Sequence, residues 1–110
     1  MGLPLADPVV LADVQHTAWT LVREGKAKLE EHTVPIGDLV ATQAVVDRER
    51  VAQDEAGYRE NGQGDERPLV LDGNLVDGGK GLLFLLSGHH HSVAVANTGA
   101  TELRVQVMTR

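Results

Sequence analysis

The chain has 110 residues, 42% of them hydrophobic and 24% charged, which suits one folded domain with a real core. Its net charge is −6, which disfavours a domain that works by clamping DNA phosphates. The chain has no cysteine, so disulfides, thiolate catalysis and cysteine-ligated zinc are excluded. Only Trp19, Tyr58 and Phe84 are aromatic, too few for a base-stacking platform. No apolar run approaches a membrane span and no basic signal region is present, so we expect a cytoplasmic protein.

The first periodic segment begins at Pro8, with Asp7 as its N-cap. Apolar residues then recur every three or four positions, as in an amphipathic helix: Val10, Val14, Ala18 and Leu21. Gly25 is expected to end this helix. A helix that continues through residues 26–31 is the alternative.

The middle of the chain is more polar. Residues 33–36 are predicted to be extended, and Pro35 makes them an edge strand or a strand end. A turn at 37–38 and a small, apolar stretch over 39–46 lead to Asp47, the expected N-cap of a helix. Residues 47–67 hold seven acids and four bases, which indicates a short solvated helix and then a mobile loop. A specific interaction surface in this stretch is the alternative.

The C-terminal half predicts a more regular series of strands and one helix. The expected elements, in chain order, are a strand at 68–71, turns at 72–74 and 77–79, a buried strand at Leu82–Leu86, an Ala/Val helix at 92–98 that ends at Gly99, and a half-buried strand around 103–107.

Three consecutive histidines stand where the buried strand is expected to run into the last helix. Such a junction exposes the unsatisfied N–H groups and the positive dipole end of the helix, and it binds phosphate or carboxylate readily. Gly88 lets the backbone approach an anion without a Cβ in the way. We therefore predict a phosphate or nucleotide site formed by Ser87, Gly88, His89, His90, His91 and Ser92.

The charge pattern around this junction agrees with an anion site. No acid occurs between Asp77 and Glu102, and Lys80 is the only fixed charge in that window, so we include it as a supporting residue. Histidine donates hydrogen bonds and can move a proton near neutral pH, which makes His90 and His91 the candidate catalytic residues.

Other interpretations of the histidines remain open. A histidine at the start of a helix can simply cap it or stay exposed. Three adjacent histidines point in different directions, whereas zinc sites prefer spaced ligands, so we predict no metal site at His89–His91. His16 and His32 are isolated and are expected at the surface.

Several stretches carry a family resemblance: Val34-Pro35-Ile36-Gly37-Asp38-Leu39, Thr42-Gln43, Val46-Asp47-Arg48-Glu49-Arg50-Val51, Pro68-Leu69-Val70-Leu71, Leu86-Ser87-Gly88-His89-His90-His91-Ser92-Val93-Ala94-Val95-Ala96 and Gly99-Ala100-Thr101-Glu102-Leu103-Arg104-Val105. Together they resemble the ParB/sulfiredoxin superfamily, whose signature is a strand leading into Asp-Gly-His-His-Arg and an Ala-rich helix. The resemblance covers roughly residues 33–108. It leaves residues 1–32 as an N-terminal helical extension before a domain at 33–110.

The resemblance implies an α+β fold, with a mixed sheet and flanking helices, and a nucleotide phosphate held at the signature turn. Superfamily members include CTP-dependent partitioning proteins, sulfiredoxin, a free-serine kinase and domains described as nucleases. ATP or another nucleotide with Mg²⁺ is therefore the implied cofactor. Gln43 and Asp47 would be supporting residues, although taken alone they suit a turn and a cap.

The departures from the family pattern narrow the function. His89 stands where sulfiredoxin needs a cysteine, so that activity is excluded. Ser87 and His91 replace the leading aspartate and the arginine of the signature, which removes a fixed bidentate phosphate ligand. Asp47, Asp72 and Asp77 are candidate general bases only if the fold brings them near His90.

Two functions follow from these observations. The first is a phosphate- or nucleotide-binding domain, with nuclease, phosphotransferase or hydrolase activity. The second is a catalytically degenerate module that binds or supports a larger assembly, through a protein partner or a second copy. Sequence-specific DNA binding is weakly supported, and no membrane association is expected.

Overall fold

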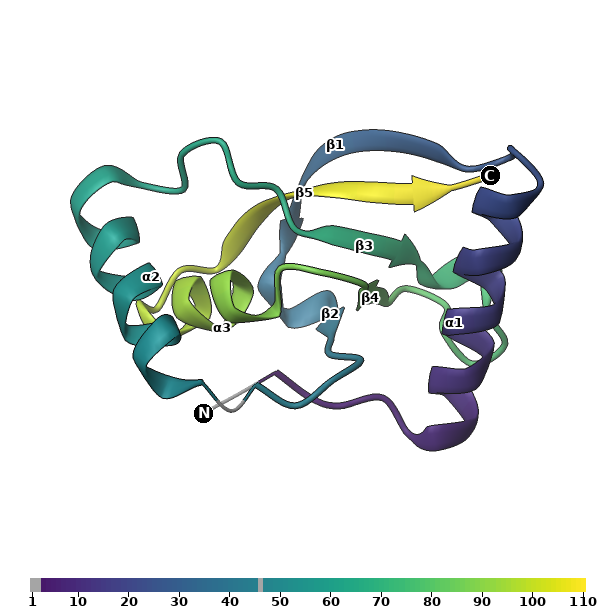
Figure 1. The fold of residues 1–110 in the computed structure, drawn as a ribbon, viewed down its shortest axis with the longest axis horizontal. Helices are drawn as coiled ribbons and strands as arrows, with labels where there is room; N and C mark the ends of the chain where they lie inside the picture. The colour runs from purple at the N-terminus through teal and green to yellow at the C-terminus, as the bar shows by residue number, and fades with distance from the viewer. Residues whose placement is uncertain (1–2, 46) are drawn as a thin grey trace.

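The computed structural model describes residues 3–45 and 47–110, and in them it shows three α-helices around a five-stranded mixed sheet (Figure 1). The expected α+β class is confirmed. The elements are α1 (Pro8–Arg23), β1 (Lys28–Pro35), β2 (Leu39–Val40), α2 (Arg48–Asn61), β3 (Leu69–Asp72), β4 (Leu83–Leu85), α3 (His89–Asn97) and β5 (Glu102–Thr109), with short 3₁₀ turns at Ile36–Asp38 and Gly73–Leu75. Met1, Gly2 and Val46, the last of which closes the predicted apolar stretch 39–46, lie outside the described residues.

The sheet has the strand order β1-β5-β3-β4-β2. Strands β1 and β5 are antiparallel, as are β3 and β4, whereas β3 runs parallel to β5 and β2 runs parallel to β4. The proline that ends β1, Pro35, lies on an edge strand as predicted. The predicted domain boundary between residues 32 and 33 falls inside β1, which pairs with β5 over all of its eight residues.

Helix α1 covers one face of the sheet. Its N-cap, Asp7, accepts hydrogen bonds from the N–H groups of two first-turn residues, and Gly25 follows the helix with a φ of +69°, so the predicted stop is confirmed. Val14 and Leu21 are buried in a cluster with residues of the sheet, including Phe84. Each such buried side chain stabilises the fold by about 1.5–3 kcal/mol, so α1 is part of the folded core.

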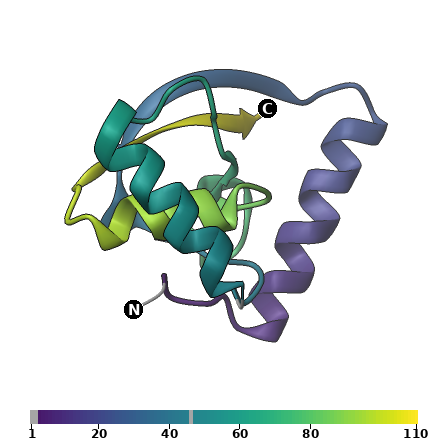
Figure 2. The same cartoon turned by 60° about the vertical axis from the view of Figure 1, so that its left-hand side comes forward.

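Helices α2 and α3 lie on the opposite face of the sheet, where α2 packs across α3 (Figure 2). Val95 of α3 is fully buried against Val70, Leu85 and Leu103 of the strands. Helix α2 is more polar and contributes the half-buried Tyr58 to this cluster. The three helices therefore sandwich the sheet, and within residues 3–45 and 47–110 none of them is long and apolar enough to span a bilayer.

The last helix begins earlier than predicted. Its first residue is His89, whereas the sequence pattern placed the start at Ser92. Gly88 adopts the left-handed conformation with a φ of +77°, and the chain turns directly from the strand into the helix there. Because of this sharp turn, all three histidines form the first turn of α3.

The connection between α2 and β3, predicted as a mobile loop, is tied to the sheet by side chains. The Gln63 side-chain amide donates to the Arg104 carbonyl at 2.6 Å and accepts from the Arg104 N–H at 2.9 Å. Arg67 donates to the Glu31 carboxylate at 2.9 Å and to two carbonyls of its own loop. These bonds fix the position of Glu66, which lies beside His91 of α3.

Candidate functional site: a cleft at the start of α3

The junction between β4 and α3 is built around a glycine that no other residue can replace without a shift of the backbone or its neighbours. The N–H groups of Leu86 and Ser87 both donate to the Leu69 carbonyl, so the chain leaves β4 held against β3. A Cβ on Gly88 would lie 2.8 Å from the Cβ of Pro68, and its positive φ disfavours side chains as well. This close packing fixes the direction in which α3 begins.

The N-terminus of α3 has no side-chain cap among the described residues. The Ser92 hydroxyl donates to the Gly88 carbonyl at 2.8 Å, and the Ser92 N–H donates to the same oxygen at 3.0 Å. Ser92 is fully buried, so its hydroxyl supports the helix and is turned away from any ligand. The first-turn N–H groups and the positive end of the helix dipole remain as anion donors.

This helix start lines a cleft of about 340 Å³. The cleft brings together most of the predicted site residues: Gln43, Ser87, Gly88, His89, His90 and His91. Two further residues, Arg50 of α2 and Glu66 of the α2–β3 connection, line it as well. Neither residue is predicted from the sequence, because a linear charge pattern does not show that the start of α2 lies beside α3.

His89 is a structural residue of this site. It is only 3% exposed, and its Nε2 accepts a hydrogen bond of 3.2 Å from the Thr42 backbone N–H. The Thr42 hydroxyl donates to the Leu85 carbonyl and lies 3.3 Å from the same Nε2. Burial, and secondarily the neighbouring His90, lower the pKa of His89 below its ordinary value. A neutral His89 therefore ties the segment after β2 to the start of α3.

His91 is placed against a carboxylate. Its Nδ1 lies 3.4 Å from Glu66 Oε2, and the residue is 7% exposed. Its Nε2 is buried and has no hydrogen-bond partner within the described part of the chain. A carboxylate on one ring nitrogen orients a histidine and supports a proton on that nitrogen, which leaves the other nitrogen as an acceptor. Residues 78–101 contain no acid, but the fold places the Glu66 carboxylate beside them.

Of the remaining predicted residues, Asp47, Asp72, Asp77 and Lys80 do not line the cleft. Asp47 is the N-cap of α2 and accepts from the Arg50 N–H at 3.0 Å, as a cap residue should. Lys80 and Asp77 belong to the loop that leads into the opposite end of β4. Asp72 accepts hydrogen bonds from the Asn74 N–H and the Thr109 hydroxyl. None of the three aspartates lines the cleft.

The described residues contain no group of three histidine, aspartate or glutamate side chains arranged to hold a metal ion. No protein-family model matches the chain, and no curated protein matches its sequence. The geometry of the cleft is therefore the basis for the function proposed below.

Proposed function

We propose that this chain is a ParB/sulfiredoxin-like domain that binds a phosphate group, carried by a nucleotide, in the cleft at the start of α3. The observation that carries the proposal is the uncapped first turn of α3, which opens into a cleft that also contains Arg50. Backbone N–H groups at a helix start and an arginine fork are both strong donors to phosphate oxygens. The order of strand, glycine and helix agrees with the family resemblance.

The charge of the cleft also favours an anion. Arg50 carries a fixed positive charge, and its side chain makes no ion pair with any described carboxylate. Glu66, the one acid in the lining, faces His91 instead. His90 is half-buried at the cleft and can donate a further hydrogen bond. A phosphate would thus meet backbone donors, one guanidinium and one imidazole.

The contacts favour binding without turnover as the primary activity. His89 is held by Thr42, and the free nitrogen of His91 is buried. Of the three histidines, His90 is half-buried while the other two are buried, so His90 is the most accessible to a bound ligand. We therefore favour a nucleotide-binding module that works as part of a larger assembly.

A hydrolase, nuclease or phosphotransferase is the second candidate. It is favoured by the pairing of Glu66 with His91, because a carboxylate that orients a histidine is a common device of general bases. In that case His90 or His91 would move the proton, and Mg²⁺ would arrive with the nucleotide.

Thermal unfolding with ATP, ADP, CTP, GTP and pyrophosphate, each with Mg²⁺, tests the binding proposal. A ligand at 100 times its Kd should stabilise the fold by about 2.7 kcal/mol. Arg50→Gln should weaken this binding about tenfold or more, because a charge-assisted contact to phosphate is lost. Arg110→Gln removes an exposed charge at the C-terminus and should leave binding unchanged. If no phosphate compound raises the melting temperature, the proposal fails.

Catalysis is tested separately on the same protein. Nucleotide hydrolysis and DNA cleavage are measured with and without chelator, for the wild type and for His90→Ala and His91→Ala. A binding module shows no turnover above buffer in either assay. Turnover that either substitution abolishes would replace the binding module with the enzyme as the better description.

A further inference from the structure

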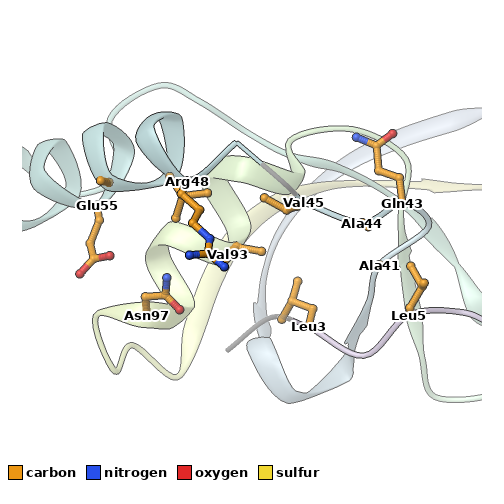
Figure 3. Close-up of a pocket in the computed structure, with 12 residues that line it drawn as sticks. Leu3, Leu5, Ala41, Gln43, Ala44, Val45, Arg48, Glu55, Val93 and Asn97 are labelled. Carbon is orange, nitrogen blue, oxygen red and sulfur yellow. The ribbon is translucent and has the colours of Figure 1, made fainter.

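A second cavity lies beside the start of α2 and is lined mostly by residues that do not line the cleft at the start of α3, which we call the phosphate cleft. It measures about 550 Å³, which falls in the range of small-molecule sites. Its lining comes from the N-terminal segment, the β2–α2 connection and two helices: Leu3, Leu5, Ala41, Gln43, Ala44, Val45, Arg48, Val51, Ala52, Glu55, Val93 and Asn97 (Figure 3). Only Gln43 is shared with the phosphate cleft.

The apolar wall of the cavity is held in place by backbone pairing. The Ala41 N–H donates to the Pro4 carbonyl at 2.7 Å, and the Ala6 N–H donates to the Ala41 carbonyl at 2.9 Å. This pairing places Leu3 and Leu5 at the cavity, where Leu5 remains 58% exposed. Leucine side chains presented to an open cavity by a fixed backbone are suited to cover an apolar ligand.

The other wall is formed by one face of α2 and one face of α3. Arg48, Val51, Ala52 and Glu55 recur at the spacing of a single helix face, and Val93 and Asn97 are one turn apart on α3. Figure 3 shows the Arg48 guanidinium between the two helices, close to Val93 and Asn97. Arg48, Asn97 and Glu55 thus lie at the helical end of the cavity, whereas Gln43 lies at the other end, near Leu5.

The charges at this helical end are unequal. The Glu55 carboxylate is paired with Arg59 at 2.9 Å, one turn further along α2. Arg48 makes no ion pair or side-chain hydrogen bond with the residues that the structure describes. The cavity therefore offers an uncompensated guanidinium beside a carboxamide, and a guanidinium fork matches a carboxylate in two parallel hydrogen bonds.

From this arrangement we propose that the cavity binds a small amphipathic carboxylate, an acid with an apolar body. The carboxylate lies on Arg48 and Asn97, and the hydrocarbon lies against Leu3, Val51 and Val93. This site shares Gln43 with the phosphate cleft, but Arg50 and the first turn of α3 do not contribute to its lining. Its ligand would be a second molecule, bound whether or not a nucleotide is present.

Titration calorimetry with straight-chain carboxylates from acetate to decanoate tests the proposal on the full chain. The affinity should rise about fourfold for each added methylene until the cavity is filled. Octylammonium has the same apolar body with the opposite charge and should bind at least tenfold more weakly than octanoate. Equal binding of the two ions, or no binding of any acid, overturns the proposal.

Two substitutions and one competitor locate the site. Arg48→Gln should weaken octanoate binding tenfold or more, while Lys28→Gln on the edge strand should not change it. Ala52→Leu, on an exposed position of α2, should fill the cavity and block binding without loss of the fold. An unchanged octanoate affinity in both variants contradicts the site. Pyrophosphate should not displace octanoate; displacement would place the acid in the phosphate cleft, whereas failure of pyrophosphate to bind at all leaves the carboxylate result intact.

Discussion

The two connections that flank β4 both contain tightly packed glycines, but they differ in how many of their hydrogen-bond donors have partners. We call residues 73–82 the closed loop and the turn from β4 into α3 the open junction. In the loop before the strand, residues 73–82, the polar groups bond to one another. The Gly73 N–H donates to the Leu82 carbonyl, the Leu82 N–H donates to the Gly79 carbonyl, and Asn74 Oδ1 accepts from the Gly81 N–H. The junction after the strand leaves the first turn of α3 without a side-chain cap in the described structure. Both rely on glycines with no room for a Cβ. The uncapped N–H groups of the first turn of α3, and not the glycines, distinguish the candidate site from a structural turn.

The largest expected effect is on the closed loop. A Cβ on Gly73 would lie 2.1 Å from the Gly79 carbonyl oxygen and 2.3 Å from that of Leu82, and backbone atoms cannot move aside. Gly73→Ala should therefore cost about 3 kcal/mol or more of unfolding free energy, measured by urea denaturation. Gly37→Ala is the control, since its Cβ would meet no described atom within 4 Å. Equal stability of the two variants would mean that the loop is not closed as described.

The open junction should be less sensitive to the same change. Gly88→Ala combines a positive φ with a contact of 2.8 Å to the Pro68 ring, and we expect a loss of about 2 kcal/mol. Gly78→Ala has the same kind of backbone, with a φ of +80°, but no described atom within 4 Å of the added Cβ. It should cost about 1 kcal/mol, from backbone strain alone. The difference between the two variants measures the packing of the junction on Pro68, and no difference would show that the packing is loose.

A third effect concerns His89, which bonds the start of α3 to Thr42. His89→Leu leaves the Thr42 N–H without its acceptor, which should cost about 1–2 kcal/mol. It should also change the pH dependence of stability. Because the pKa of His89 is lowered on folding, the unfolded chain takes up a proton there that the folded chain does not. The stability contribution is complete above the ordinary pKa of 6.5 and is lost as the pH falls below it, toward the folded pKa.

Melting temperatures between pH 7.5 and 5 check this linkage. The wild type should lose stability on acidification more steeply than His89→Leu. His32→Gln, on the exposed edge strand, is the control and should follow the wild type. If His89→Leu keeps the full slope, His89 is not the group that titrates.

The sequence predicts the fold class and most of the elements, because apolar spacing and cap residues are local signals. Asp7, Gly25 and Gly99 mark helix ends where the structure has them. The start of α3 was placed three residues late, since a histidine run carries no helix signal of its own. Only the left-handed conformation of Gly88 shows that the helix begins at His89.

For the candidate site, the sequence indicates the position along the chain better than it indicates which side chains meet there. Residues Ser87–His91 line one cleft, and their role in binding phosphate stays a prediction. Glu66 and Arg50 could not be found from the sequence, because they reach the cleft through the packing of α2 on α3 and through the tied α2–β3 connection. Burial also divided the three histidines, which look equivalent in the sequence: His89 and His91 are buried and His90 is not.

The smallest expected effect tests whether the α2–β3 connection, which Gln63 bonds to β5, helps to shape the cleft at the start of α3. Strand β3 pairs with β5 only along Gln106–Met108, and the Gln63 side chain takes the place of a strand beside Arg104. Gln63→Ala should cost about 1 kcal/mol and should speed hydrogen exchange of the Arg104 amide. Gln53→Ala, on an exposed position of α2, should change neither quantity.

Loss of the Gln63 contacts should also reach the cleft. Because the same connection carries Glu66, a looser loop should let the carboxylate leave His91. The ring resonances of His91 in an NMR spectrum should then shift in Gln63→Ala and in Glu66→Gln, and in the same direction. If only Glu66→Gln moves them, the Arg67 contacts to Glu31 and to the loop carbonyls are enough to keep Glu66 in place, and the cleft does not depend on the bond to β5.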